Sequence, residues 1–330
     1  MSQEKTGKYQ RKSKVVPAST AAGVIKDSDT VGTGGFVGNG FAEELAVAVE
    51  TRFLQTRSPK NLTLVYAAGQ GDGREKGLNH FGHEGMVGKV IGGHWGLVPK
   101  LQKLAVENKI QAYNLPQGII STMFRDIAAK KPRTISAVGL GTFVDPRNGG
   151  GKINSITTDD IVELIEFDGN TYLSYKPFPI DVALLRGTTA DPDGNITMEK
   201  EALTLEVLAL AMAAKNSGGK VIVQVERIAE RGTLNCRQVV IPGIMVDYVV
   251  ISQPENHWQT FGEKYNPAYS GEIRVPMESL PEMEMGERKI IARRAAFELA
   301  PGDIVNLGIG MPEGVANVVN EERVLDQIVM

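Results

Sequence analysis

The sequence predicts an α/β fold with an open, mainly parallel sheet and helices on both of its faces. Strand and helix patterns alternate along most of the chain, as they do in βαβ units. Strand patterns such as Leu62–Ala68 are continuous apolar runs, which is typical of strands buried on both faces. Several strands also end in glycines, above all in the stretch Asp29–Ala42 directly before a helical pattern.

The first part of the chain supplies the elements of this sheet in order. Pro17 is well placed to begin a helix, because it fixes φ and lacks a backbone N–H. The glycine-rich stretch begins as a strand, and its glycines would let backbone N–H groups approach a ligand. The elements expected next are helix Glu43–Leu54, strand Leu62–Ala68, a strand near Val90–Ile91, helix Pro99–Asn108, strand Gln111–Asn114, helix Ile119–Ala129 and strand Ile135–Leu140.

The middle of the chain departs from this alternation. A glycine-rich loop covers Gly141–Ile153, and Asp168-Gly169-Asn170 predicts a hairpin turn between two strand patterns. The elements expected here are strands Ile161–Phe167, Tyr172–Tyr175 and Ala183–Leu185, a long helix Lys200–Asn216 capped by Gly218-Gly219, and strands Val221–Val225, Val239–Ile241 and Tyr248–Ile251.

Composition along the chain predicts four segments. Residues 1–14 are polar and basic without a hydrophobic period, so we expect a flexible arm. Residues 15–252 form a first domain. Residues 253–286 carry four prolines and few periodic apolar positions, which is typical of a linker or crossover. A fresh helix begins at Glu287, and residues 287–330 begin a second domain.

The second domain repeats the start of the first. A shift of 274 residues aligns Val16–Ala42 with Ile290–Ala316 without a gap. The shared residues include Asp29 with Asp303, Gly34 with Gly308, and Gly40 with Gly314. We therefore predict a duplicated fold whose second copy is incomplete.

Composition excludes several classes of function. The 330-residue chain has a net charge of −3 and a pI near 5.9, so we expect no nucleic-acid or anionic-membrane partner. No apolar run approaches the length of a membrane span. The single cysteine, Cys236, fits a reducing compartment and is interpreted as a small apolar filler. These features predict a cytoplasmic protein.

Motifs for metal, redox and nucleophilic chemistry are weak. Gly32-Thr33-Gly34 begins like a dinucleotide fingerprint, but Val37 occupies the third glycine position, so an NAD-dependent oxidoreductase is the less favoured alternative. His80 and His83 could suggest a metal, yet hydrogen bonding in a loop or interface is the favoured interpretation. No serine-nucleophile elbow or P-loop is present.

Several motifs then resemble the family I coenzyme A transferases. Gly34–Gly40, Tyr113–Gly118, Gly139–Phe143 and Arg186–Asp191 with Gly194-Asn195 resemble the α half, although Ala42 stands where that family usually has proline. Gly308–Pro312 resembles the start of the β half. The likeness is greatest to the fused short-chain enzymes that use acetate or propionate. It implies a CoA-transferase-like fold, an acyl-CoA and a short-chain carboxylate as substrates, and a homo-oligomer.

The resemblance also implies the chemistry. A glutamate carboxylate would attack the acyl-CoA and pass through a glutamyl-CoA thioester, without a metal or redox cofactor. In that family the glutamate lies on the strand after the opening helix of the β half, which here is Gln327–Met330. We therefore expect the nucleophile just beyond Met330, no catalytic glutamate in this chain, and no activity from this chain alone. The rest of the β half would be a separate fragment or chain.

The resemblance assigns few residues in this chain. Gln117 matches an active-site glutamine that would orient the substrate, with helix capping as the alternative. Gly34, Gly35, Gly308 and Gly310 would line a cleft between the halves. Glu313, Glu321 and Glu322 do not fit the nucleophile's place. A non-catalytic ligand-sensing module on the same fold is the alternative function.

Overall fold

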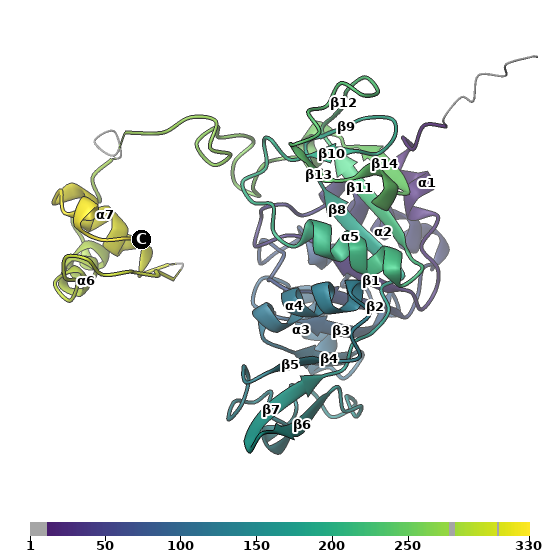
Figure 1. Cartoon of the computed structure of the whole chain (residues 1–330), viewed down its shortest axis with the longest axis horizontal. Coiled ribbons are helices and arrows are strands. Elements are labelled where there is room, and N and C mark those ends of the chain that lie inside the picture. The colour runs from purple at the N-terminus through teal and green to yellow at the C-terminus, as the bar shows by residue number, and fades with distance from the viewer. Residues whose placement is uncertain (1–11, 277–280, 309) are drawn as a thin grey trace, which may run out of the picture. The chain divides into compact units, whose positions relative to one another are not determined.

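The computed structural model describes residues 12–276, 281–308 and 310–330 and contains two compact units (Figure 1). The first unit is Met1–Ser270 and the second is Gly271–Met330. Most of the predicted flexible arm, residues 1–14, lies outside the described residues. No helix in the described ranges is long and apolar enough to cross a membrane.

A seven-stranded sheet forms the centre of the first unit. Its strand order is β14-β11-β8-β1-β2-β3-β4, and every neighbouring pair is parallel. This is the open parallel sheet that the sequence predicts. The strands are β1 (Thr30–Thr33), β2 (Leu62–Tyr66), β3 (Val87–Gly92), β4 (Gln111–Asn114), β8 (Val182–Arg186), β11 (Lys220–Val225) and β14 (Tyr248–Ile251).

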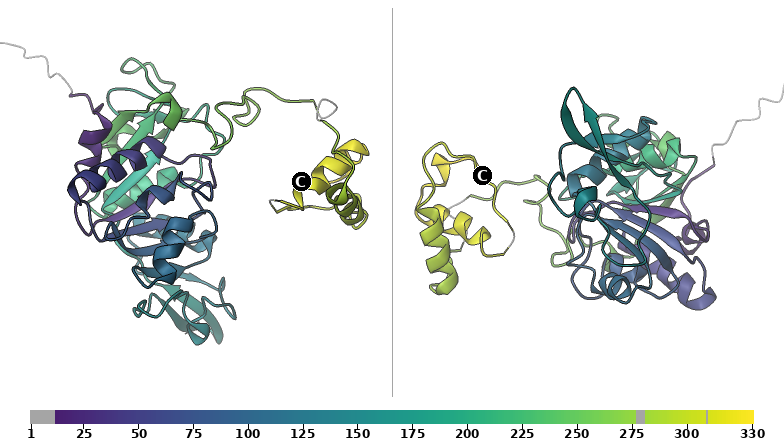
Figure 2. Two further views of the ribbon diagram at one scale, coloured as in Figure 1. Left: turned by 180° about the vertical axis from the view of Figure 1, so that it is seen from behind. Right: turned by 90° about the horizontal axis from the view of Figure 1, so that it is seen from below.

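Helices cover both faces of this sheet. In Figure 1, α4 (Gln117–Ala128) and α5 (Val207–Asn216) lie in front, and the view from behind in Figure 2 shows the helices of the first part of the chain on the other face. Those helices are α1 (Ala18–Ala22), α2 (Glu43–Thr56) and α3 (Pro99–Val106). Each set packs in its own hydrophobic core. The predicted α/β class with helices on both faces is confirmed.

The continuous apolar strand patterns follow from these two cores. In β8, Val182 and Leu184 belong to the core under α1–α3, while Ala183 and Leu185 belong to the core under α4 and α5. Successive side chains of a strand point to opposite faces. A strand between two helical layers must therefore be apolar at every position.

A separate three-stranded antiparallel sheet contains the predicted hairpin. Its order is β5-β7-β6, from β5 (Thr134–Ser136), β6 (Val162–Phe167) and β7 (Asn170–Tyr175). The predicted strand Ile135–Leu140 is therefore wrong in length and in place. The segment stops pairing with β7 after Ser136. Two residues later, the carbonyl of Val138 accepts a hydrogen bond from the hydroxyl of Tyr175.

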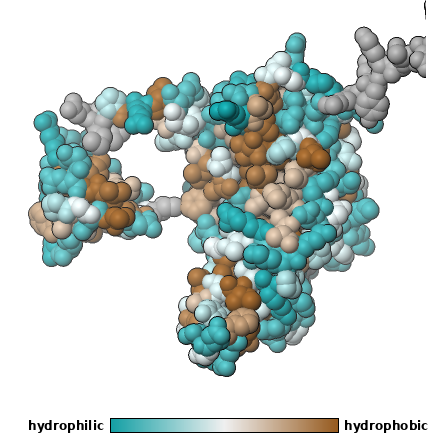
Figure 3. All heavy atoms as spheres, in the orientation of Figure 1, coloured by the Kyte–Doolittle hydropathy of each residue, from teal (hydrophilic) through white to brown (hydrophobic). Residues whose placement is uncertain are grey.

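Apolar side chains are exposed on this small sheet and its loops. Ile135 is 46% exposed, Phe143 is 55% exposed and Phe167 is 50% exposed. Figure 3 shows apolar residues gathered on the lobe that β5, β6 and β7 form. Leu173 and Tyr175 lie on the opposite face of β7 from Tyr172. They belong to the hydrophobic core under α4 and α5.

The motif Arg186–Asn195 runs from the end of β8 into another sheet, which has four short strands. This sheet has the order β12-β9-β10-β13, from β12 (Arg227–Ile228), β9 (Thr189–Ala190), β10 (Ile196–Thr197) and β13 (Val239–Ile241). Between β9 and β10, the carboxylate of Asp191 accepts hydrogen bonds from the backbone of Asp193 and Asn195, both at 3.0 Å. The aspartate of the motif thus holds a tight turn.

The helix predicted over Lys200–Asn216 begins only at Val207. Leu205 has a left-handed backbone with φ of 49°, which a helix does not contain. Glu201 is buried in an ion pair with Arg186. A tertiary contact therefore overrides the helical pattern of residues 200–206.

The structure divides the predicted linker 253–286 between the two units, with the boundary after Ser270. Residues 253–270 belong to the first unit, and Gln259 in this segment is only 2% exposed. Hydrogen bonds from Arg186 to the carbonyls of His257 and Trp258 hold the segment against the end of β8. The prolines of this segment interrupt regular secondary structure, but the segment stays packed against the first unit.

The second unit repeats the opening turn of the first. It contains α6 (Glu287–Ala296) and α7 (Glu313–Glu321), with a parallel bridge between Ile304 and Val329. The carboxylate of Asp303 accepts from the backbone of Ala300 at 2.8 Å, as Asp29 accepts from Lys26 at 2.8 Å.

The residues before these aspartates also correspond. Ser28 and Gly302 both have positive φ, 68° and 89°. Each donates its backbone N–H to a carbonyl of the segment that leads into the following strand. Ser28 donates to Lys60, and Gly302 donates to Gln327. The gapless alignment of the two segments therefore describes one turn used twice.

The two glycines that end α5 give a direct test of the fold. A Cβ at Gly219 would lie 2.3 Å from the backbone oxygen of Ile180, whereas a Cβ at Gly218, where φ is +82°, would meet nothing within 4 Å. We expect Gly219→Ala to lower the free energy of unfolding by about 3 kcal/mol and Gly218→Ala by about 1 kcal/mol. Urea unfolding measures both. Equal losses would contradict the packing of this turn.

Candidate functional site

The strand order places a natural binding crevice at the carboxyl end of β1. From β1 the chain adds β2, β3 and β4 on one side and β8, β11 and β14 on the other. In open α/β sheets, ligands bind outside the carboxyl ends of the strands where the order reverses in this way. The glycine-rich stretch that follows β1 lies at this point.

Gly34 and Gly35 are packed beneath the surface of the glycine-rich loop. Both are buried, and Gly35 has a φ of +137°, which favours glycine. The buried side chain of Gln70 donates to the carbonyls of Thr33 and Gly35, each at 3.1 Å. The start of the loop is therefore rigid, and the cleft-lining role of the two glycines stays a prediction.

Gln117 lies at the same edge of the sheet, directly after β4. It is the first residue of α4 and is exposed. The N-cap of α4 is Pro116, and no side chain caps this end, so the structure gives no support to a capping role for Gln117. An exposed amide at a helix N-terminus can donate to an anionic or carbonyl group.

Glycines allow close packing between the loops that lie from the end of β1 to Gln117. The N–H of Val37 donates to the carbonyl of Gly69 at 2.7 Å. A Cβ at Gly69 would lie 2.3 Å from the ring of His94. A Cβ at Gly93 would lie 1.9 Å from the carbonyl oxygen of Ala67 and 3.0 Å from the Cα of Gln117.

This close packing defines the candidate site. The loops after β1, β2, β3 and β4 pack closely, since a side chain at Gly93 would meet the backbone of Ala67 and Gln117, and one at Gly69 would meet the ring of His94. The resulting surface carries the exposed residues Gln117 and His94. We name it the glycine edge, and it is suited to hydrogen bonding with a carbonyl or carboxylate.

Gly308 and Gly310, the other predicted lining residues, belong to the second unit. Gly310 has a φ of +96°, and its carbonyl accepts a hydrogen bond from Arg288 at 3.0 Å. Gly308 is exposed. Their part in a cleft stays a prediction.

His80 and His83 form a chain of contacts with two glutamates of α2. The two ring nitrogens of His80 lie 2.9 Å from Glu43 and 2.5 Å from Glu50, and His83 lies 2.5 Å from Glu50. Within the described residues, no group of three or more potential ligands is arranged to hold a metal ion. The favoured interpretation, hydrogen bonding in a loop, is what the structure shows.

This chain of contacts shifts the protonation of its members. Burial opposes a positive charge on His80, but the carboxylates of Glu43 and Glu50 outweigh it, so the pKa of His80 is raised above 6.5. Burial opposes a negative charge on Glu50, but hydrogen bonds from His83 and His80 outweigh it, so the pKa of Glu50 is lowered below 4.5. The network therefore favours a charged imidazole beside a charged carboxylate.

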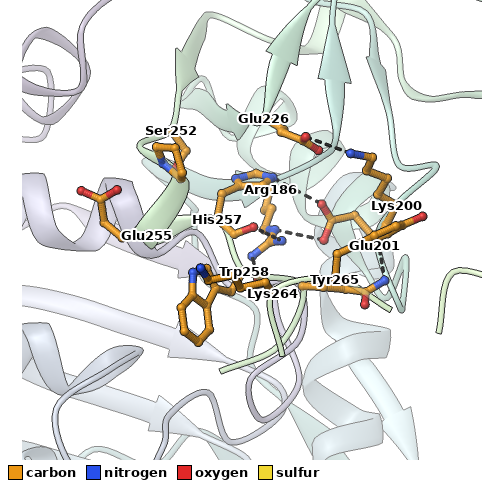
Figure 4. Close-up of a pocket in the computed structure, with 12 residues that line it drawn as sticks. Arg186, Lys200, Glu201, Glu226, Ser252, Glu255, His257, Trp258, Lys264 and Tyr265 are labelled. Carbon is orange, nitrogen blue, oxygen red and sulfur yellow. Dashed lines mark hydrogen bonds and ion pairs between the residues drawn. The ribbon is translucent and has the colours of Figure 1, made fainter. Parts of the chain in front are cut away.

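A cavity of about 630 Å³ opens at the carboxyl ends of β8, β11 and β14. In Figure 4, Arg186 points toward Glu201 and Lys200 toward Glu226. The cavity lies entirely in the first unit. Its lining residues are Arg186, Lys200, Glu201, Glu226, Ser252, Pro254, Glu255, His257, Trp258, Gln259, Lys264 and Tyr265.

The inner wall of this cavity is a buried ionic network. The Nε of Arg186 lies 2.9 Å from Glu201, and the two side chains are 4% and 2% exposed. Burial favours the neutral acid, but Arg186 and His257 outweigh it and lower the pKa of Glu201. Burial also lowers the pKa of His257 despite the nearby Glu201, which favours a neutral imidazole.

Sequence reasoning did not assign Glu201 or His257 to any site. Arg186 belongs to the motif Arg186–Asp191, which gives it no role of its own. Its partners lie 15 residues away in Glu201 and 71 to 72 residues away in the segment His257-Trp258, and no periodic pattern connects them. Only the order of the strands brings the three residues together.

Cys236 is exposed, so its interpretation as a buried apolar filler was wrong. It lies between β12 and β13. Glu206, at the N-cap of α5, is buried, and one of its carboxylate oxygens has no hydrogen-bond partner among the residues that the structure describes. Burial raises the pKa of Glu206, and sequence reasoning did not single this residue out.

A family comparison assigns this architecture. The sequence profile described as coenzyme A transferase matches residues 16–252. The chain belongs to the coenzyme A transferase family. The match spans the strands and loops of the first unit that build the glycine edge, so the predicted resemblance is confirmed.

Two curated relatives are similar to nearly the whole chain. A caffeate CoA-transferase of Acetobacterium woodii is 50% identical over 318 residues, which are 96% of this chain and 61% of the relative. The acetate CoA-transferase YdiF of Escherichia coli K12 is 38% identical over 319 residues, covering 96% and 60%. The chain thus spans about 60% of the length of these relatives.

Solved structures show the same relation. The apoenzyme of the acyl-CoA transferase YdiF from Escherichia coli O157:H7 superposes with a TM-score of 0.89 at 38% identity, covering 96% of this chain and 60% of YdiF. Glutaconate coenzyme A-transferase from Acidaminococcus fermentans, at 20% identity and a TM-score of 0.61 over 78% of this chain and 82% of that one, shows similarity of fold.

The His80 network predicts a pH dependence of stability. Because the folded pKa of His80 is raised, its contribution is complete below about pH 6.5 and is lost as the pH rises through the raised value. Because the folded pKa of Glu50 is lowered, its contribution is complete above about pH 4.5 and is lost as the pH falls through the lowered value.

We expect His80→Gln to lower the unfolding free energy by about 1–3 kcal/mol near pH 5.5, and by less above the raised pKa. Urea unfolding from pH 4 to 9 measures the difference. His94→Gln is the matched control, because the described part of the chain shows no ion pair for His94. A His80→Gln difference that stays constant with pH would contradict the network.

Proposed function

We propose that the protein transfers coenzyme A between an acyl-CoA and a carboxylic acid. The observation that carries this proposal is the family match over residues 16–252, together with 50% identity to a caffeate CoA-transferase over 96% of this chain. The glycine edge supports it, because the exposed amide of Gln117 suits a developing oxyanion on a thioester carbonyl.

The proposed substrate is a short-chain acid such as acetate or propionate. The two curated relatives carry the names of acetate and caffeate, which share a carboxylate and differ in the body attached to it. The carboxylate is therefore the group that the conserved chemistry must recognise. A preference for a short chain follows from the predicted resemblance to the acetate and propionate enzymes.

The proposed reaction proceeds in two exchange steps on a glutamate. Its carboxylate attacks the thioester carbonyl, CoA thiolate leaves, and a mixed anhydride forms. The thiolate then attacks the glutamyl carbonyl, which releases the first acid and leaves a glutamyl-CoA thioester. The acceptor carboxylate reverses these steps and leaves as the new acyl-CoA. A crystal structure of YdiF is described as a thioester complex with CoA, which supports this route.

This route needs no metal or redox cofactor, since each step exchanges one acyl bond for another. We assign the nucleophile to no glutamate of this chain. Gln117 is proposed to orient the acyl group from the end of β4. Gly34 and Gly35 are proposed to form the wall of the cleft on the first unit, with Gly308 and Gly310 on the second.

Three further statements remain proposals. A homo-oligomer and a partner segment that supplies the rest of the β half follow from the predicted resemblance. A cytoplasmic location follows from composition. None of these affects the arrangement of the glycine edge, which lies wholly within the first unit.

Transfer of CoA from acetyl-CoA to propionate, measured in the full-length protein, tests the proposed function. We expect Gln117→Ala to lower kcat/KM about tenfold or more, because one hydrogen bond to the reacting group is lost. Gln55→Ala is the control, since Gln55 is an exposed glutamine near the C-terminal end of α2. Its kcat/KM should match the wild type.

Two results would contradict the proposed function or the role given to Gln117. Binding of acetyl-CoA without transfer to any carboxylate tried would favour the ligand-sensing module. Equal activity of Gln117→Ala and Gln55→Ala would remove Gln117 from the reaction while leaving the transferase function intact.

A further inference from the structure

The segment 253–270 crosses the carboxyl edge of the sheet, and we name it the strap. It begins after β14, beside the cavity at the ends of β8 and β11. Its residues Thr260–Gly262 reach the glycine-rich loop, where they share a smaller cavity of about 250 Å³ with Val37–Asn39. The strap therefore contacts the ends of strands on one side of β1 and also the glycine-rich loop that follows β1.

Arg186 is the central anchor of the strap. Its guanidinium donates to the carbonyl of Trp258 at 2.7 Å and to that of His257 at 3.3 Å. Its Nε pairs with Glu201 at 2.9 Å. One side chain, fixed at the end of β8, thus holds two consecutive peptide groups. The planar fork of arginine suits such a multiple contact, whereas lysine cannot reproduce it.

Other contacts hold the strap on either side of this anchor. Glu44 of α2 accepts from the backbone of Gln253 at 3.2 Å and from the side chain of Asn256 at 2.8 Å. The buried Gln259 donates to the carbonyl of Lys200 at 2.8 Å. Arg186 therefore lies between flanking contacts, and its replacement by lysine should loosen the strap without releasing it.

The tip of the strap presses on the glycine-rich loop. A Cβ at Gly38 would lie 2.7 Å from the backbone nitrogen of Phe261 and 2.9 Å from its ring. The absence of a side chain at Gly38 is what lets Phe261 approach. Lys76, from the loop after β2, lies 4.9 Å from the ring centre of Trp258 and 5.7 Å from that of Phe261.

Several polar groups that line the larger cavity contact each other. Arg186 pairs with Glu201, and Lys200 pairs with Glu226 at 2.9 Å. Gln224 donates to the Nδ1 of His257 at 3.1 Å. These contacts describe the attachment of the strap better than they describe a ligand site.

We propose that Arg186 is a positioning residue that acts, through the strap, on the glycine-rich loop. It fixes the peptide groups of His257 and Trp258, which sets Phe261 against Gly38 and holds that loop in the shape that receives the acyl-CoA. The inference rests on the proposed function. It gives a role to the arginine of the Arg186–Asp191 motif and to Gly38, neither of which the sequence assigned.

A double-mutant cycle in the full-length protein tests this coupling. The variants are Arg186→Lys, Phe261→Ala and the double variant, each assayed for kcat and for the KM of acetyl-CoA. We expect each single change to raise KM about tenfold, and the double change to raise it little further, because both disturb the same contact. Multiplied effects in the double variant would overturn the proposal.

Fluorescence of Trp258 reports the strap without reference to activity. This chain has two tryptophans, so within it Trp95→Phe leaves Trp258 as the only tryptophan, and excitation at the red edge of tryptophan absorption avoids the tyrosines. In that background we expect Arg186→Lys to shift the emission to longer wavelength as Trp258 gains solvent. Arg147→Lys is the matched control, because Arg147 is an exposed arginine paired with Asp145.

The two readouts separate the two ideas. If the wild type transfers no CoA but Trp258 responds to Arg186→Lys, the proposed function fails while the anchoring of the strap stands. If the wild type is active and Arg186→Lys changes neither KM nor the emission of Trp258, the proposed function stands and the positioning role of Arg186 is wrong. A lower unfolding temperature of Arg186→Lys with unchanged KM and unchanged Trp258 emission would likewise show that Arg186 has only a structural role.

Discussion

The pairing of β1 with β2 on one side and β8 on the other is the constraint on which the first unit depends. It makes the glycine-rich stretch the loop at which the strand order reverses. Every element that contributes to the candidate site reaches it from a strand end at this edge. Gly93 then lets its loop approach the backbone of Ala67 and Gln117, and Gly69 makes room for the ring of His94. The chemistry proposed for the protein uses the polar groups that this contact leaves at the surface.

Local patterns predicted the parallel sheet because their signals lie within short stretches of sequence, as in the apolar runs of β2 and β11, which indicate burial on both faces. Gln117 was assigned only from the resemblance to the coenzyme A transferases, and its role stays a prediction. The strap could not be predicted in this way. Arg186 and Trp258 are 72 residues apart, and the prolines around them resemble those of a linker. The helical pattern before Val207 failed for the same reason, since the ion pair of Glu201 with Arg186 is a tertiary contact.

The second unit shows what an internal repeat preserves. Asp29 and Asp303 accept the same backbone hydrogen bond, and the preceding residues have positive φ in both copies. The helices that follow are less alike, because α7 begins at Glu313 whereas the aligned start of α2 corresponds to Asn317. Hydrogen bonds that shape the turn are thus retained more closely than the helix boundary, where several residues can begin the first turn.

Hydrogen–deuterium exchange of the full-length protein, with and without acetyl-CoA, tests the central claim most directly. The account predicts slower exchange in the loops of the glycine edge, in the segments Gly34–Gly40, Gly92–Gly96 and Pro116–Ile119, and in the strap. Loops at the opposite edge of the sheet, such as Arg57–Asn61, should exchange at an unchanged rate. Protection confined to that opposite edge, or none in the glycine edge while the protein turns over acetyl-CoA, would contradict the assignment of the site.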